Sequence, residues 1–269
     1  MILFYDNTEN RLIFIEKKAT PERWDNHWLL DDTNARKAID KGKGDNFVTR
    51  ITLKFLVPDA GGILEGGCGN GKHVSALAKK GFRVIGIDSA PSTVSVLNKN
   101  APELDIRLGD LRNLPLKDTS MAGYWSLGVI EHYYHGYTDI AKEMVRVLKP
   151  GGYLFLTFPY MSPIRRLKAI LGLYPIYHGH DEPEDFFQYA LDHNKVLNQF
   201  SMMGFSICLF QPQAGLKGLK DEVRFLRVPL QKLYDYRGEN IFIRGFRYFL
   251  DQVFSPLTGH SCLNVLKKR

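Results

Sequence analysis

The 269-residue sequence has few cysteines and no long hydrophobic run. Its three cysteines, Cys68, Cys208 and Cys262, are odd in number and far apart. That pattern argues against a disulfide framework and against a clustered zinc site. No apolar run approaches the ~18 to 20 residues that a membrane-spanning helix needs. An acidic residue, Asp6, stands where a secretory signal would be basic. We therefore expect a cytoplasmic protein without a transmembrane segment.

Positive charge is in modest excess. The chain has 36 Lys and Arg against 29 Asp and Glu, a net charge of +7, and 44% of its residues are apolar. This composition is typical of a globular protein. Fifteen basic and ten acidic residues follow Tyr160, so most of the excess lies in the C-terminal part. Such a field attracts phosphates, anionic lipid or nucleic acid, and it does not define a fold.

The N-terminal region predicts a hairpin followed by a helix. Residues 2–5 and 11–15 are β-prone runs separated by a polar stretch. Further on, Trp24 and Trp28 are four residues apart, so one helical face carries both. Two interpretations stay open here: a helix packed on the domain, or a lid over a ligand.

From Gly62 onward, short strands alternate with helices. Apolar runs occur at residues 63–64, 84–87, 104–106, 124–127 and 153–156, and helical patterns lie between them at 72–80, 91–99 and 138–148. This alternation predicts an α/β fold, a Rossmann-like doubly wound parallel sheet with helices on both faces.

The pattern loosens after Pro159. Residues 164–174 predict an amphipathic segment with Arg165, Arg166 and Lys168 beside its apolar stripe. We consider two roles for it: contact with a membrane surface, or a cap helix with its charges in water. Later patterns predict a helix capped by Asp192, strands at 205–210 and 261–266, and a helix at 241–254.

A glycine-rich loop joins the first strand of this region to its first helix. It reads Glu65-Gly66-Gly67-Cys68-Gly69-Asn70-Gly71-Lys72. Glycines there let the backbone approach a ligand closely, and the following helix offers free N–H groups. A phosphate-binding P-loop is disfavoured, because His73 replaces the magnesium-binding hydroxyl and Glu65 is negative. A dinucleotide fingerprint has a longer glycine spacing than Gly67-x-Gly69-x-Gly71.

The remaining interpretation is a site for S-adenosylmethionine, which carries positive charge and no phosphate. A carboxylate beside the loop attracts such a ligand. Asp88 follows the next strand, where a carboxylate can accept both ribose hydroxyls. Asp110 ends the strand after that and is placed to accept the adenine amino group.

Residues 63–159 resemble the class I S-adenosylmethionine-dependent methyltransferases, in particular the methyltransferase type 11 branch. Five ordered motifs carry the resemblance: Leu64-Glu65-Gly66-Gly67-Cys68-Gly69-Asn70-Gly71, Val84-Ile85-Gly86-Ile87-Asp88, Gly109-Asp110-Leu111, Ser126-Leu127-Gly128-Val129-Ile130-Glu131-His132 and Arg146-Val147-Leu148-Lys149-Pro150-Gly151-Gly152. The family's usual Asp before the fourth strand is absent. The resemblance implies a seven-stranded sheet of order 3-2-1-4-5-7-6 with the last strand antiparallel.

The same resemblance implies roles for single residues. The cofactor-binding set is Glu65, Gly67, Cys68 and Gly69 for the methionine portion, Asp88 with Ser89 for the ribose, Asp110 and Leu111 for the adenine, and Leu127 and Gly128 beside the sulfonium. The implied regions are an N-terminal hairpin and helical lid segment (1–50), a cofactor-binding core (51–160), a cap and acceptor-side segment (161–204), and two last strands (205–269) with helical insertion 211–260.

Glu131 and His132 follow the fourth strand, on the side where the methyl group should point. We predict both as catalytic, with His132 either a general base that orients the acceptor or a residue that shapes the pocket. Their spacing with His135 matches no zinc motif, so we expect no metal. Residues predicted to contact the acceptor are Trp24, Trp28, Tyr133, Tyr160 and Tyr189.

Together these patterns predict a methyltransferase that modifies an oxygen or nitrogen atom of a small molecule or of a glycan or lipid precursor. A nucleic-acid partner is disfavoured, because no RNA-binding motif is visible. Two alternatives stay open: an RNA-directed methyltransferase, and a non-catalytic cofactor-binding protein of the same fold. Peripheral contact with a membrane is also left open.

Overall fold

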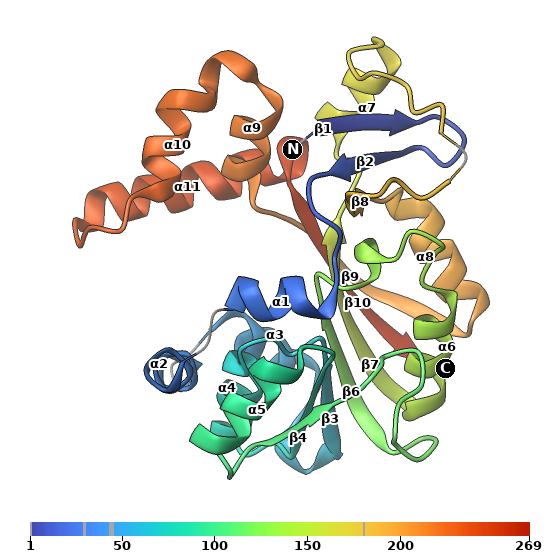
Figure 1. The fold of residues 1–269 in the computed structure, drawn as a ribbon, viewed down its shortest axis with the longest axis vertical. Helices are drawn as coiled ribbons and strands as arrows, with labels where there is room; N and C mark the ends of the chain where they lie inside the picture. Colours follow the sequence, from blue (N-terminus) through green and yellow to red (C-terminus); the bar gives the residue numbers. More distant parts are fainter. Residues whose placement is uncertain (1, 29–30, 43–45, 180) are drawn as a thin grey trace.

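A computed structural model describes residues 2–28, 31–42, 46–179 and 181–269. A seven-stranded sheet forms its centre, in the order β5-β4-β3-β6-β7-β10-β9 (Figure 1). These strands are β3 (Gly62–Gly66), β4 (Val84–Asp88), β5 (Asp105–Leu108), β6 (Met121–Leu127), β7 (Leu148–Pro159), β9 (Phe205–Gln213) and β10 (Ser261–Lys268). The order confirms the predicted 3-2-1-4-5-7-6.

Strand directions also agree with the prediction. β3 pairs in parallel with β4 and with β6, and β6 pairs in parallel with β7. β10 is antiparallel to both of its neighbours, so that Leu263 lies opposite Thr157 on β7 and Gln211 on β9. The carboxyl ends of β3, β4, β5 and β6 therefore meet at one edge of the sheet.

Helices cover both faces of this sheet. On one face, the buried residues of the sheet pack against α6 (Thr138–Val147) and α8 (His193–Met202). On the other face they pack against α2 (Asp32–Gly42), α3 (Phe47–Phe55), α4 (Lys72–Lys79) and α5 (Pro91–Asn100). The fold is therefore doubly wound, as predicted. Asp192 caps α8 by accepting hydrogen bonds from the backbone N–H groups of Asn194 and Lys195.

A second, antiparallel sheet contains the predicted hairpin. Its order is β1-β2-β8, with β1 (Ile2–Asp6), β2 (Arg11–Ile15) and β8 (Phe186–Ala190). Leu12, Phe14 and Ala190 form a small core with Met161 and Tyr174. β8 was not apparent from the sequence, because its pairing partner, β2, lies more than 170 residues earlier in the chain.

The segment at 164–174 differs from expectation. Its helix, α7 (Pro163–Ile170), ends early, and Arg165 is only 1% exposed. The Nε of Arg165 lies 2.8 Å from Oε1 of Glu222 on α9 (Gly215–Glu222), and its Nη1 donates to the Tyr160 carbonyl oxygen. The expectation that this arginine lies in water is wrong, because a carboxylate distant in sequence pairs with it in the interior.

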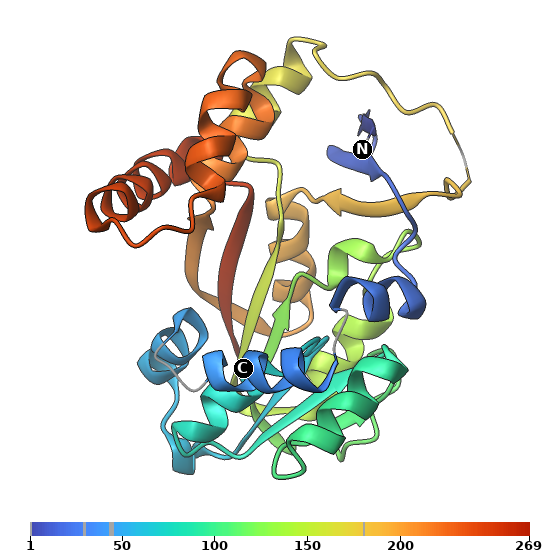
Figure 2. The same ribbon diagram turned by 60° about the vertical axis from the view of Figure 1, so that its left-hand side comes forward.

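A helical region lies between β9 and β10. It contains α9, the 3-10 turn η3 (Arg224–Leu226), α10 (Arg227–Asp235) and α11 (Ile241–Thr258). α11 extends four residues beyond the predicted helix. Figures 1 and 2 show α10 and α11 projecting from the side of the sheet. Among the helices the structure describes, none combines the length and apolar character needed to cross a membrane.

Candidate functional site

The glycine loop between β3 and α4 needs its glycines for conformational reasons. Gly67, Gly69 and Gly71 have φ angles of 75°, 48° and 70°, in the left-handed region. A Cβ atom on Gly67 would also lie 2.6 Å from Cγ2 of Val129. The loop thus leaves its backbone open above the sheet edge, where a side chain would strain the chain.

Asp88, at the end of β4, holds the loop in place. Its Oδ2 accepts a 2.7 Å hydrogen bond from Gly69 N–H, and its Oδ1 accepts one of 3.0 Å from Ala90 N–H. The carboxylate is 6% exposed, and burial raises its pKa although these hydrogen bonds oppose the shift. Asp88 therefore stabilises the loop in addition to its predicted contact with ribose.

Glu65 lies in β3 under the loop and is 1% exposed. Burial raises the pKa of its carboxyl well above the usual value, and the nearby Asp88 carboxylate raises it further. Its Oε2 has no hydrogen-bond partner among the described residues. A buried, uncompensated acceptor beside a second carboxylate is an environment that a cationic ligand stabilises. These residues fit the ammonium group of S-adenosylmethionine.

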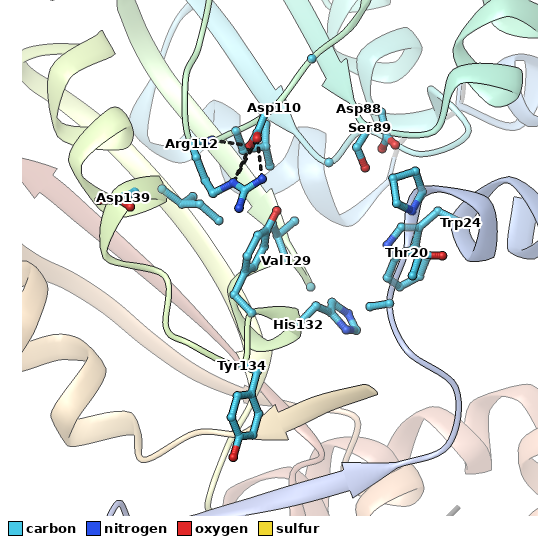
Figure 3. A pocket seen from close by; sticks show the side chains of 18 of the residues that line it. Thr20, Trp24, Asp88, Ser89, Asp110, Arg112, Val129, His132, Tyr134 and Asp139 are labelled. Atoms are coloured by element: carbon cyan, nitrogen blue, oxygen red, sulfur yellow. Dashed lines mark hydrogen bonds and ion pairs between the residues drawn. The ribbon is translucent and has the colours of Figure 1, made fainter. Parts of the chain in front are cut away.

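A cavity of about 770 Å³ opens at the carboxyl edge of the sheet (Figure 3). It lies between the strand ends and α1 (Pro21–Trp28). Eleven predicted site residues line it: Trp24, Trp28, Gly67, Asp88, Ser89, Asp110, Leu111, Leu127, Gly128, His132 and Tyr133. Their individual roles stay predictions, and the structure brings them around one space.

One wall of the cavity carries an ion pair that the sequence did not indicate. Arg112 donates to both carboxylate oxygens of Asp110, at 2.7 Å from Nη2 and 3.0 Å from Nε. The Arg112 side chain lowers the pKa of Asp110. Asp110 is therefore ionised at neutral pH, and Arg112 orients it at the end of the cavity predicted for adenine.

Helix α1 packs against the glycine loop. The Trp28 ring lies directly over Gly69. Asp25 of the same helix accepts hydrogen bonds from Thr93 N–H (2.7 Å) and Oγ1–H (2.8 Å), at the start of α5. The helix is thus packed on the domain and also lines the cavity, so the two open interpretations are compatible in geometry. No sequence pattern indicated the Asp25 contact.

His132 forms part of the cavity wall. Its Nδ1 lies 2.7 Å from the carbonyl oxygen of Phe187, so Nδ1 carries the proton and Nε2 keeps its lone pair. Burial lowers the pKa of His132 to about 4, which makes the ring neutral at physiological pH. Trp24 packs edge-on against it, with ring centroids 4.9 Å apart, and Figure 3 shows the two side chains facing each other.

Several predicted residues do not line this cavity. Glu65, Cys68 and Gly69 lie beneath or within the loop, and Glu131 is 2% exposed behind the wall. Burial raises the pKa of Glu131 to about 8, so its carboxyl is protonated at neutral pH.

Two predicted acceptor residues, Tyr160 and Tyr189, are buried elsewhere. Tyr160 packs against His193 and Phe210, and the Tyr189 hydroxyl donates to the Tyr134 carbonyl oxygen. Pairing within the β1-β2-β8 sheet and at the end of β7 turns both rings away from the cavity. Neither tyrosine lines the cavity, so the structure does not support the expectation that they contact the acceptor.

Sequence reasoning also missed part of the lining. The additional residues come from four segments. Lys18 and Thr20 precede α1, Arg112 follows β5, Tyr134 follows β6, and Glu182 precedes β8. No motif marks these positions. Among the described residues, no group of three or more His, Cys, Asp or Glu side chains is placed to hold a metal ion.

Comparison with known proteins gives the class of this site. A family model described as a methyltransferase domain matches residues 64–156. A probable S-adenosylmethionine-dependent methyltransferase of Mycolicibacterium smegmatis is 38% identical over 97 residues, 36% of this chain and 37% of the relative. A ubiquinone biosynthesis O-methyltransferase of Xanthomonas oryzae pv. oryzae is 30% identical over 115 residues, 41% of this chain and 48% of the relative. The chain spans about a third to a half of these relatives.

Solved structures share the whole fold at low sequence identity. A SAM-dependent methyltransferase from Archaeoglobus fulgidus aligns with a TM-score of 0.52 at 13% identity, over 93% of this chain and 100% of that chain. A geranyl diphosphate methyltransferase in complex with SAM aligns with a TM-score of 0.51 at 14% identity, over 98% and 99%. The fold is that of the class I methyltransferases. Within it, residues 64–156 are similar in sequence to the methyltransferase domain of S-adenosylmethionine-dependent methyltransferases.

Proposed function

We propose that the protein transfers a methyl group from S-adenosylmethionine to an oxygen or nitrogen atom of a small molecule or of a glycan or lipid precursor. The observation that carries the proposal is the shared cavity: Asp88 and Asp110 line it together with the neutral ring of His132. Direct transfer requires that both molecules bind in one cavity. A cavity of about 770 Å³ with a cofactor end and an acceptor end meets this requirement.

The cofactor residues follow from charge and position. Glu65, buried beneath the loop and outside the cavity lining, offers its unpaired Oε2 to the ammonium group. Asp88 and Ser89 accept the ribose hydroxyls, and Asp110 accepts the adenine amino group beside Leu111. Gly67, Cys68 and Gly69 leave backbone next to the methionine portion, with Leu127 and Gly128 on the sulfonium side. When bound, S-adenosylmethionine supplies a methyl group on an activated leaving group, so the protein contributes mainly alignment and exclusion of water.

His132 receives the proton of a hydroxyl acceptor. Its Nε2 lone pair is available because Phe187 fixes the proton on Nδ1, and Trp24 limits rotation of the ring. A base is needed only for an acceptor that starts protonated. The O-methyltransferase relatives support an oxygen acceptor for this chain.

Calorimetry with S-adenosylmethionine tests the first half of the proposal. We expect Asp88→Ala and Gly67→Arg to abolish most of the binding, and Asp105→Ala, an exposed aspartate at the start of β5, to bind like the wild type. Because Asp88 also supports the loop, thermal melting must show that each variant is folded. Unchanged affinity in both site variants would contradict the proposed site.

Transfer of labelled methyl groups into a cell extract tests the second half. The structural neighbours include the [4+2]-cyclase SpnF, with a TM-score of 0.54 at 16% identity over 94% of this chain and 98% of that one. The fold is therefore compatible with a reaction other than methyl transfer. Cofactor binding without any labelled product would favour this second candidate, or a non-catalytic role.

An RNA acceptor makes a separate prediction. Contacts with phosphates would make affinity for RNA fall steeply as salt increases. Salt-sensitive RNA binding together with labelled RNA would replace the small-molecule proposal. We expect neither.

A further inference from the structure

α11 exposes a continuous apolar stripe to solvent. Phe242, Phe246, Phe249, Val253 and Leu257 recur every three or four residues, and their side chains are 84%, 56%, 58%, 50% and 60% exposed. Positions at this spacing lie on one helical face, and here they extend over about 22 Å. The opposite face, which includes Ser255 and Thr258, packs on the domain.

Two further apolar side chains are exposed on the preceding turn and helix. Phe225 in η3 and Val228 in α10 are 81% and 69% exposed. We call this surface, from Phe225 to Leu257, the projecting face. In Figures 1 and 2 the α10–α11 connection is the part of the region furthest from the seven-stranded sheet.

Positive charge accompanies the projecting face. Residues 224–250 contain six basic and two acidic side chains. The exposed basic residues are Arg224, Arg227, Lys232, Arg237 and Arg244. Within the described part of the chain, none of these five forms an ion pair with a carboxylate. Both acidic residues, Asp235 and Glu239, lie off the apolar stripe, near the α10–α11 connection.

An exposed apolar stripe together with basic surroundings indicates which kind of partner the projecting face fits. The stripe is rich in phenylalanine and contains no charged residue. The surrounding region carries arginine and lysine side chains that form no ion pair within the described residues, although Arg244 lies on the face of α11 opposite the stripe. Amphipathic helices that lie in a membrane interface have this composition. Each cation near an anionic bilayer adds attraction, and the aromatic side chains enter the boundary between headgroups and acyl chains. Residues 224–250 carry six basic side chains against two acidic ones, so the surroundings of the stripe are mainly positive, which favours an anionic surface over a second copy of this chain.

We propose that the projecting face docks the protein peripherally on an anionic lipid bilayer. Phe242 and Phe225 enter the interface first because they are the most exposed. Arg224 and Arg227 contact lipid phosphates. This site replaces α7 as the membrane-contacting element, because Arg165 of α7 is buried against Glu222. The proposal does not depend on the nature of the methyl acceptor.

Co-sedimentation of the full chain with lipid vesicles tests the docking. Vesicles of phosphatidylcholine mixed with phosphatidylglycerol are compared with phosphatidylcholine alone, at low and at high salt. We expect the wild type to bind the anionic vesicles at least about ten-fold more strongly, and to lose most of that preference in high salt.

Two pairs of substitutions locate the contact. Phe242→Ser with Phe249→Ser should lower vesicle binding at least about ten-fold. The matched control, Ile170→Ser with Leu171→Ser at the end of α7, removes an equally exposed apolar pair (82% and 60%) and should bind like the wild type. Calorimetry with S-adenosylmethionine and thermal melting confirm that each variant is folded.

Three results would overturn the proposal. One is a wild type that does not bind anionic vesicles. Another is a Phe242 and Phe249 variant that binds them as well as the wild type does. The third comes from sedimentation velocity: a dimer that the same variant dissociates would mean that a second copy of the chain covers the projecting face.

Discussion

Replacing Glu131 with glutamine should change how stability depends on pH. In the folded chain burial raises the pKa of this carboxyl to about 8, from 4.5 for an unperturbed group. As pH rises, Glu131 loses its proton in the unfolded chain first, and it stays protonated in the folded chain up to about pH 8. Wild-type stability from this group is therefore full below about pH 4.5 and is lost progressively between pH 4.5 and pH 8.

The magnitude follows from the shift. Each pKa unit corresponds to about 1.36 kcal/mol, so raising the pH from 5 to 8 lowers the wild-type free energy of unfolding by roughly 3 to 4 kcal/mol through Glu131. Glutamine does not titrate, and any fixed cost of burying its amide is the same at both pH values. The stability of Glu131→Gln relative to wild type should therefore improve by the same roughly 3 to 4 kcal/mol from pH 5 to pH 8.

Urea unfolding of both proteins at pH 5, 6, 7 and 8 measures this difference directly. Glu143→Gln is a suitable control, because the ion pair with Arg146 lowers the pKa of Glu143 and predicts no such gain towards pH 8. A difference between wild type and Glu131→Gln that stays constant within ~0.5 kcal/mol would refute the reasoning, because it would mean that the folded carboxyl ionises normally. Methyl transfer by the same variant tests the predicted catalytic role of Glu131.

Three further predictions follow. Asp25→Ala removes the contact between α1 and α5, so Trp28 should leave the glycine loop; we expect several-fold weaker S-adenosylmethionine binding by calorimetry and a change in tryptophan fluorescence, and neither change if α1 is held elsewhere. His132→Ala should lower kcat for a hydroxyl acceptor by ~10²-fold or more with cofactor affinity retained, and an unchanged kcat would exclude its role as a base. Arg165→Met leaves Glu222 buried with fewer cations and should destabilise the fold by about 3 kcal/mol in urea unfolding, whereas a loss below ~1 kcal/mol would show that Lys168 compensates.

The core of the site was predictable because its determinants are local. Glu65, Asp88 and Asp110 lie at or just after the carboxyl end of a strand, and parallel strands bring these ends to one edge of the sheet. The glycines follow from the left-handed turn between β3 and α4. Strand order came from the resemblance of the ordered motifs to a family, and the structure confirms it.

The remaining features depend on contacts between segments that are distant in the sequence. Glu131 and His132 are adjacent in the chain, yet one is buried behind the wall and the other lines the cavity. Tyr160 and Tyr189 are aromatic residues near strand ends, and only the tertiary structure shows that they do not line the cavity. The periodicity of apolar residues in the sequence predicts which positions face a core. It does not predict which other segment of the chain packs on them.

Charge gives the clearest contrast. The sequence by itself determined a net charge of +7 concentrated after Tyr160, and it left open whether the basic residues of 164–174 contact a membrane surface or lie in water. Only the tertiary structure decided that Glu222 neutralises Arg165 in the interior, and that α11 exposes an apolar stripe in a region whose exposed cations form no ion pair among the described residues. The physical reason is that an arginine is buried only where the fold supplies a carboxylate and carbonyl oxygens to receive it, and such partners come from remote segments.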